Sequence, residues 1–221
     1  MDVRRLGLIG YQEALDIQKD LVEQRRNGVI PDQLLLLEHP PVITLGVKAR
    51  SSRSHVLESD ASLAAKGVGV FETGRGGDVT YHGPGQLVGY PIFDLKPDRC
   101  DVHQYVRDLE EALIRAVAGF GIPARRVKGL TGVWVGPDDS EEKLAAIGVR
   151  ISRWITSHGF ALNVNTTLEH FGLIVPCGIT DRGVTSMQRL LGRSVSMDEV
   201  SAHVVAAFRE VFEAPRFQPL T

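Results

Sequence analysis

The sequence has few cysteines and no long hydrophobic run, and each absence argues against a class of protein. Its two cysteines, Cys100 and Cys177, are too few for a disulfide framework and lack the paired spacing of a zinc site. This usage is typical of a reducing compartment, so we expect a cytoplasmic protein. The first apolar run is short and is interrupted by Glu13, Asp16 and Lys19, so neither a secretory leader nor a membrane span is expected.

An excess of charge of one sign is also lacking. The chain has 25 basic and 27 acidic side chains and a formal net charge of −2, so no overall positive field exists to attract nucleic acid or an anionic membrane. Its seven histidines form neither an HxxxH nor an HExxH pattern, so no metal site is expected. The length of 221 residues suits one hydrophobic core, and we expect a single domain over residues 1–221.

Helical and strand patterns alternate along the chain. Helical spacing of apolar residues predicts a helix from near Tyr11 to Gly28, and a second helix follows the N-cap residue Asp101. Ser196 and Glu199 match a capping box before a third helix. Short apolar runs predict strands at residues 33–38, 42–45, 69–73, 87–95, 132–135, 143–149 and 159–164, with a polar loop over 50–60.

The segment Arg75–Gln86, RGGDVTYHGPGQ, holds four glycines, an arginine and a histidine between two predicted strands. Glycine allows sharp turns and close approach to a bound group, and glycine-rich turns expose N–H groups that can hold a polarised oxygen. This segment is therefore interpreted as a binding loop. The alternative is a glycine-rich hairpin in which His82 only satisfies a neighbouring group.

Several sequence blocks, taken in order, resemble the lipoyl(octanoyl) transferases, the lipoate biosynthesis protein B family. The blocks cover most of the chain and are Glu38–Pro41, Thr44–Gly46, Arg75–Gln86, Tyr90–Pro91, Lys143–Val149, His158–Asn165 and Pro176–Ile179. One position departs from the family pattern, because Asp78 stands where the family has glutamine. An acidic side chain there changes how this loop meets a substrate, whereas main-chain contacts are retained.

The resemblance implies a fold, an activity and a set of partners. The fold is α+β, a mixed central β-sheet with packed helices as in the biotin and lipoyl protein ligases. The activity is that of an acyltransferase, which moves an octanoyl group from octanoyl-acyl carrier protein to the target lysine of lipoyl domains in the first step of protein lipoylation. The implied acceptors are the lipoyl domains of 2-oxoacid dehydrogenase E2 subunits and the glycine cleavage H protein. No cofactor is implied beyond the carrier's phosphopantetheine, and we expect a monomer.

The same resemblance implies catalytic roles for Cys177 and Lys143. A thiolate attacks a thioester readily and leaves well when an amine arrives, so Cys177 is the expected nucleophile, activated by Lys143. Lys143 acts either as a neutral amine base or as the ammonium of a thiolate–ammonium pair. The implied substrate-binding residues are Arg75, Gly76, Gly77, Asp78, Val79, Thr80, Tyr81, His82, Ala146, Ile147, Gly148, Gly159, Phe160 and Ala161.

Two other functions fit parts of the sequence. Lys143–Val149 followed by Gly159–Asn165 also resembles the lysine strand and following region of ATP-dependent biotin and lipoate ligases, which need no cysteine nucleophile. A non-catalytic module that binds lipoyl domains would need neither reactive group. Taken alone, Cys177 is interpreted as a buried structural thiol and Lys143 as a surface charge. The two residues together with the glycine-rich segment favour the transferase.

Overall fold

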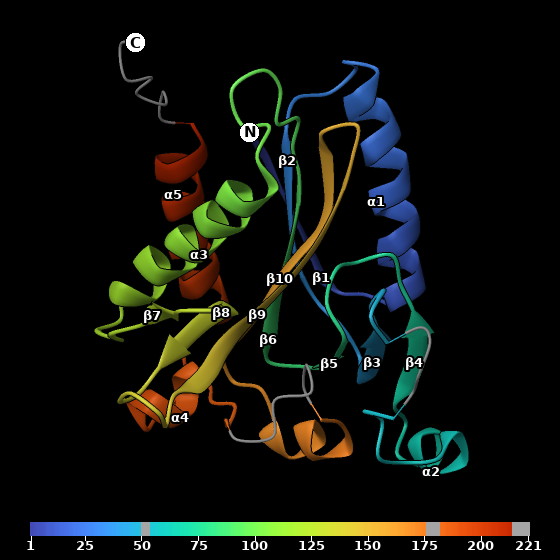
Figure 1. The fold of residues 1–221 in the computed structure, drawn as a ribbon, viewed down its shortest axis with the longest axis vertical. Helices are drawn as coiled ribbons and strands as arrows, with labels where there is room; N and C mark the ends of the chain where they lie inside the picture. Colours follow the sequence, from blue (N-terminus) through green and yellow to red (C-terminus); the bar gives the residue numbers. More distant parts are fainter. Residues whose placement is uncertain (50–53, 176–181, 214–221) are drawn as a thin grey trace.

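A large mixed β-sheet crosses the molecule, and a small sheet lies at one end of it (Figure 1). The computed structural model describes residues 1–49, 54–175 and 182–213. In spatial order the large sheet contains β1 (Asp2–Leu8), β2 (Gln33–Glu38), β6 (Gln86–Ile92), β10 (Ile155–Asn163), β9 (Glu142–Ser152), β8 (Leu130–Val135) and β7 (Arg125–Val127). β1 and β2 run parallel, and the other neighbouring pairs run antiparallel. The predicted α+β architecture with a mixed sheet is confirmed.

Helices cover both faces of this sheet. α3 (Val102–Ala118) and α5 (Met197–Phe212) pack side by side on one face, and α1 (Tyr11–Arg26) covers the other (Figure 1). The leucine run of β2 suits this position, because its alternate side chains enter the clusters on opposite faces of the sheet. A strand that is buried on both faces carries a continuous apolar run rather than an alternating one.

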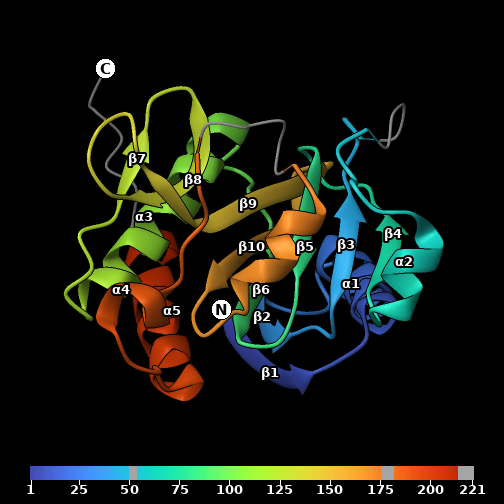
Figure 2. The same cartoon turned by 90° about the horizontal axis from the view of Figure 1, so that it is seen from below.

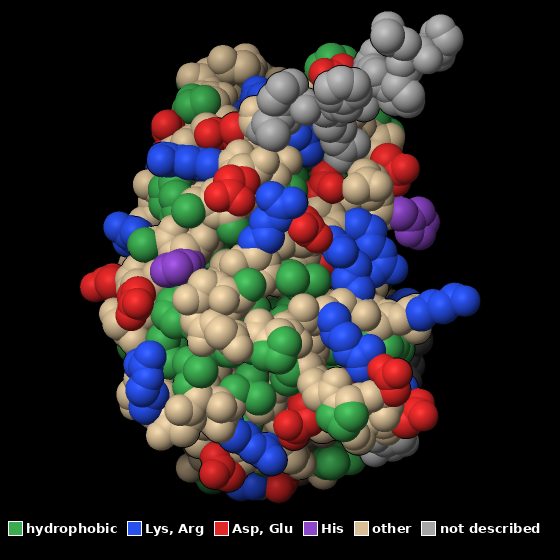
Figure 3. Space-filling view, turned by 90° about the vertical axis from the view of Figure 1, so that its left-hand side faces the viewer, with side chains coloured by type: hydrophobic (Ala, Val, Ile, Leu, Met, Phe, Trp, Pro, Cys, Tyr) green, Lys and Arg blue, Asp and Glu red, His purple; other side chains and the backbone are tan. Residues whose placement is uncertain are grey.

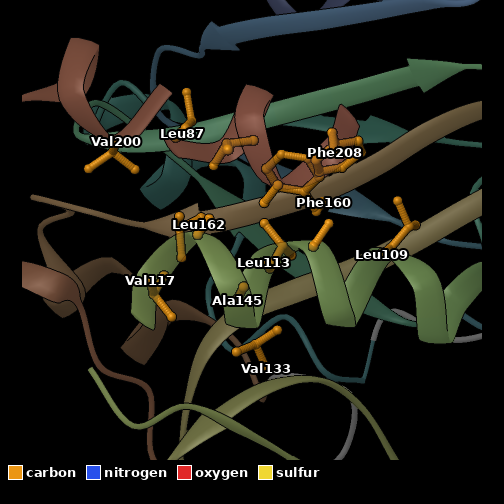
Figure 4. Close-up of a cluster of buried hydrophobic side chains, with 14 of the residues drawn as sticks. Leu87, Leu109, Leu113, Val117, Val133, Ala145, Phe160, Leu162, Val200 and Phe208 are labelled. Carbon is orange, nitrogen blue, oxygen red and sulfur yellow. The ribbon is translucent and has the colours of Figure 1, made fainter. Parts of the chain in front are cut away.

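The core between α3, α5 and the sheet contains interlocked aliphatic and aromatic side chains (Figure 4). The ring centroids of Phe160 on β10 and Phe208 on α5 are 5.5 Å apart. A Cβ atom at Gly89 of β6 would lie 2.1 Å from Phe160 Cζ, so glycine is required for that ring to lie against the neighbouring strand. Phe208 is fully buried. This core fixes the position of β10, which also forms part of the site described below.

The small sheet consists of β4 (Gly69–Glu72), β3 (Val42–Leu45) and β5 (Val79–His82), with β3 in the middle. Its apolar face packs with α2 (Asp60–Ala65) and the 3-10 helix η1 (Leu168–Leu173) in a second buried cluster (Figure 2). A short helix, α4 (Met187–Leu191), precedes α5. The glycine-rich segment therefore spans both sheets, because it starts beside β4 and ends in β6.

The predicted strands at residues 33–38 and 42–45 are confirmed at the same bounds. The capping predictions are also confirmed, since Asp101 accepts a hydrogen bond from the Gln104 N–H and Ser196 accepts one from the Glu199 N–H. Residues 75–86, which are interpreted above as a loop, contain a strand, because residues 79–82 form β5. The loop predicted over 50–60 includes residues 50–53, which lie outside the described residues, and it ends at Ser59, the N-cap of α2.

Basic and acidic side chains are interspersed on the side of the molecule that carries α3 and α5 (Figure 3). This mixed surface agrees with the nearly balanced count of 25 basic and 27 acidic residues. Among the helices of residues 1–49, 54–175 and 182–213, none combines the length and apolar character needed to span a bilayer.

Candidate active site

A cavity of about 530 Å³ is lined by both sheets and by the segment between β4 and β5. The predicted substrate-binding residues on its wall are Arg75, Gly76, Gly77, Asp78, Val79, Thr80, His82, Ala146, Ile147, Gly148, Gly159, Phe160 and Ala161. They come from segments far apart in the sequence, and β9 and β10 bring two of these groups together by pairing Phe160 with Ile147 and Gly159 with Gly148.

Tyr81 is the predicted substrate-binding residue that does not line this cavity. Side chains alternate between the faces of a strand, so Tyr81 points away from the face that carries Thr80 and His82. Its ring lies in the buried cluster that the small sheet forms with α2 and η1, and its hydroxyl oxygen is 2.9 Å from His170 Nδ1. Burial raises the pKa of Tyr81 to about 12. The geometry therefore gives Tyr81 a packing position.

Arg75 holds the glycine-rich segment against β3. Its guanidinium is buried and donates to Thr44 O at 2.6 Å, Asp78 O at 2.8 Å and Gly76 O at 3.0 Å. Arg75 is one of the predicted substrate-binding residues, and its carbonyl contacts give it a structural function. Because it remains a cation on the cavity wall, it also acts on the ionisable groups around it.

Asp78 and His55 form a close contact beside the cavity. Asp78 Oδ2 lies 2.6 Å from His55 Nδ1. The backbone carbonyl of His55 accepts a hydrogen bond from the Val175 N–H at 2.8 Å. Asp78, the residue that departs from the family pattern, therefore has a specific partner. That partner, His55, also binds Val175, the last described residue before Cys177.

A directional hydrogen-bond chain fixes the state of His82. Gln86 Nε2 donates to Asn163 Oδ1 at 2.9 Å, so Gln86 Oε1 is the acceptor facing His82 Nδ1 at 2.8 Å. His82 therefore carries its proton on Nδ1 and presents Nε2 as an acceptor. Burial, reinforced by His39, lowers the pKa of His82 to about 3. Gln86 and Asn163 are not among the predicted site residues, although both lie in sequence blocks that match the family.

Other ionisable groups on the same wall are also held neutral. Burial, with the charges of Arg75 and Arg150, lowers the pKa of His158 to about 4. Burial raises the pKa of Tyr11 to about 12 and that of Tyr90 well above its usual value. The imidazoles and phenols at this end of the cavity are therefore uncharged near neutral pH. Such a wall offers hydrogen-bonding groups without adding charge.

Lys143 enters the cavity from β9 and is only 9 % exposed. The backbone N–H of Lys143 donates to Gly183 O at 2.9 Å, and its backbone carbonyl accepts from the Thr185 N–H at 3.0 Å. Its Nζ lies 4.7 Å from the centroid of the Trp134 ring. Cys177 lies outside the described residues, but the segment that follows it passes directly beside Lys143 at Gly183.

The chain matches known proteins over most of its length. Residues 10–209 match the family model of the lipoyl protein ligase A/B catalytic domain. The chain is 54 % identical to an octanoyltransferase of Rubrobacter xylanophilus over 97 % of this chain and 95 % of that one. An octanoyltransferase of Chloroflexus aurantiacus is 53 % identical over 100 % of this chain and 98 % of its own. One from Myxococcus xanthus is 54 % identical, and the chain spans 60 % of its length.

Solved structures of low sequence identity share the fold. A lipoate-protein ligase A bound with ATP superposes with a TM-score of 0.73 at 18 % identity, covering 96 % of this chain and 86 % of that one. A bipartite lipoate protein ligase from Thermoplasma acidophilum gives 0.72 at 18 % identity, with 100 % and 88 % covered. The ligase-like fold predicted from the sequence is thus confirmed. The chain belongs to the octanoyltransferases, acyltransferases of the lipoyl protein ligase A/B catalytic domain family.

Proposed function

We propose that the chain transfers an octanoyl group from octanoyl-acyl carrier protein to the target lysine of lipoyl domains through a thioester on Cys177. The observation that carries this proposal is the position of Lys143. Its side chain is buried on the wall of the cavity, and its backbone pairs with Gly183, six residues after Cys177. A buried amine of this kind is suited to activating a thiol.

In the first half-reaction, the Cys177 thiolate attacks the octanoyl thioester carbonyl. The new bond from Cys177 Sγ to the acyl carbon forms as the bond to the pantetheine sulfur breaks. Lys143 holds the proton released by Cys177 and delivers it to the departing pantetheine thiolate. The products are the acyl-enzyme and the carrier with a free thiol, so protons and electron pairs balance.

In the second half-reaction, the amine of a lipoyl-domain lysine attacks the acyl-enzyme. The carbon–nitrogen bond forms and the bond to Cys177 Sγ breaks. Lys143 takes up the proton lost by the attacking amine, and Cys177 leaves as a thiolate. The enzyme returns to its starting state, and no cofactor is consumed beyond the carrier's phosphopantetheine.

The proposed acyl site is the part of the cavity lined by small and apolar side chains. Ala146 contributes a small side chain from β9, while Ile147 and Phe160 supply apolar surface. An octanoyl chain would place about seven apolar carbons there, and at about 0.8 kcal/mol each their burial contributes roughly 5–6 kcal/mol. One methylene more or less changes the preference by about tenfold to two-hundredfold.

The proposed acceptors are the lipoyl domains of 2-oxoacid dehydrogenase E2 subunits and the glycine cleavage H protein. The Thermoplasma acidophilum system of the same fold comprises a ligase and its E2 lipoyl domain, which supports an acceptor of this class. The monomeric state and the cytoplasmic location expected from the sequence stay predictions, as does the expected absence of a metal.

The decisive assay mixes the chain with octanoyl-acyl carrier protein and an unmodified lipoyl domain, and measures the mass of the lipoyl domain. Octanoylation without ATP is the expected result. Modification that requires free octanoate and ATP would instead identify a ligase. Binding of the lipoyl domain with no modification under either condition would identify a non-catalytic module.

A further inference from the structure

Trp134 and Lys143 form a cross-strand pair, of which Lys143 lines the cavity. Trp134 on β8 is the registered partner of Lys143 on β9. Trp134 is 1 % exposed, and the lysine Nζ lies over its ring at 4.7 Å from the centroid. An ammonium within about 6 Å of an indole face is attracted by the negative charge distribution of that face, most strongly when water is excluded.

The backbone next to this pair requires a glycine. Gly132 has a φ of +124°, and a Cβ atom there would lie 2.6 Å from Ala145 O. The same position is 3.6 Å from both Lys143 Cε and Trp134 Nε1, so the backbone of Gly132 packs directly against the pair.

A buried carboxylate fixes that glycine. The Gly132 N–H donates to Glu110 Oε1 at 3.0 Å, and Glu110 on α3 is fully buried. The other carboxylate oxygen of Glu110 contacts Arg107 at 2.6 Å and Arg126 at 3.2 Å. α3 therefore holds the strand segment against which the lysine lies.

We propose that Trp134 is a positioning residue that holds the Lys143 ammonium over its indole face and directs it into the cavity. The inference rests on the proposed function. The sequence is compatible with Lys143 as a neutral amine or as an ammonium, and the inference assigns the ammonium form to the resting enzyme. Among the described residues, the other charged side chains on the cavity wall are Lys48, Arg75 and Asp78. Arg75 donates to carbonyls of the segment it anchors, and Asp78 contacts His55.

The test measures alkylation of Cys177 by iodoacetamide as a function of pH, in a Cys100→Ser background that removes the exposed second thiol. Trp134→Leu should slow alkylation at pH 7 by about threefold to tenfold, within the range of a desolvated cation–π contact, and should move the acidic limb of the profile to higher pH. Trp134→Phe keeps an aromatic face and should stay within about twofold of the parent.

Two comparisons separate positioning from a general packing defect. In a Lys143→Met background, Trp134→Leu should cause no further loss, because the cation is already absent. An equal loss with and without Lys143, or an equal loss in the Leu and Phe variants, would overturn the proposal. No octanoyl substrate is used, so this result is independent of whether acyl transfer itself is observed.

A spectroscopic readout covers the case in which Trp134→Leu does not fold. The chain has two tryptophans, so Trp154→Phe leaves Trp134 as the sole indole. The emission of that variant should change when Lys143 is replaced by Met, because a charge over the ring is removed. Identical emission with and without Lys143 would also overturn the proposal.

Discussion

Individual residues at the polar end of the cavity stay uncharged mainly because they are buried. Arg75 is a charge shared by the neighbourhoods of Tyr11, His82 and His158. Its guanidinium disfavours the imidazolium form of the two histidines and favours the phenolate form of Tyr11, but burial is the larger cause at all three residues. The wall therefore presents neutral hydrogen-bonding groups near neutral pH.

The buried, neutral state of His82 predicts that the stability of the fold depends on pH. The pKa of His82 is lowered to about 3 in the folded protein from an ordinary 6.5, so the unfolded chain binds the proton first as the pH falls. Stability is therefore unaffected above pH 6.5 and is lost as the pH falls from 6.5 toward 3. His82→Asn should reduce the slope of unfolding free energy against pH, between pH 4 and 6, by about 1.4 kcal/mol per pH unit.

Urea unfolding at several pH values measures this slope. Asparagine is chosen because its amide can still donate to Gln86, and His103→Asn on the exposed surface of α3 is the matched comparison. A slope in His82→Asn equal to that of the parent would contradict the buried neutral state.

The Asp78–His55 contact predicts an energetic coupling between two loops. Because the His55 side chain is 37 % exposed, solvent weakens the pair, and Asp78→Asn should lower the unfolding free energy by about 0.5 kcal/mol. The loss should vanish in a His55→Gln background, as measured by a double-mutant cycle of urea unfolding. Additive losses in the double variant would mean that the two side chains do not interact.

At the scale of elements, the site depends on the close approach of β3 to the glycine-rich segment. A Cβ atom at Gly46 would lie 2.4 Å from Gly77 O and 2.8 Å from Arg75 Nη1. Gly46→Ala should therefore displace the segment, lower stability by about 1–3 kcal/mol and reduce the transfer rate more than tenfold.

Thermal unfolding and the lipoyl-domain assay together measure both effects. Gly172→Ala is the control, because a Cβ atom at Gly172 meets no other atom within 4 Å. Wild-type behaviour in Gly46→Ala would show that the segment and β3 can separate without consequence.

Elements were predictable where the local pattern and the tertiary environment agree. The leucine run of β2 fits a strand buried on both faces, and capping residues marked α3 and α5. β5 was missed because its glycine-rich flanks favour a loop, and it becomes a strand only by pairing with β3. β1 was missed because it is a largely exposed edge strand with adjacent arginines, so it lacks the pattern of a buried strand.

In the molecule as a whole, the stabilising core and the site share β10, because Phe160 belongs to the core and also lines the cavity. Phe208 packs against Phe160 from α5, on the face of the sheet where α3 also lies (Figure 4). Phe208→Ala should lower the unfolding free energy by about 3–5 kcal/mol, because it removes a fully buried ring. The transfer rate per folded molecule should also fall, by about threefold or more, because Phe160 loses the ring that supports it. Chemical unfolding and the transfer assay check the two statements, and unchanged stability or an unchanged transfer rate would contradict them.

From the sequence, the site is predictable only at positions that match the blocks of the octanoyltransferase family. Most of the residues that the resemblance implies lie together on the cavity wall, whereas strand alternation places Tyr81 in the buried cluster of the small sheet. Trp134 could not be assigned to Lys143 in advance, because the register between β8 and β9 includes a bulge that no local pattern reveals. Cys177 lies outside the described residues, and its role is tested by measuring the mass of the acyl-enzyme.

The most direct test of the account is the intact mass of the chain after incubation with octanoyl-acyl carrier protein and no acceptor. The account predicts one octanoyl group per chain, removed by hydroxylamine, absent in Cys177→Ala and retained in Cys100→Ala. Octanoyl transfer to a lipoyl domain by the Cys177→Ala variant at the parent rate, with no covalent acyl-enzyme in either protein, would contradict it.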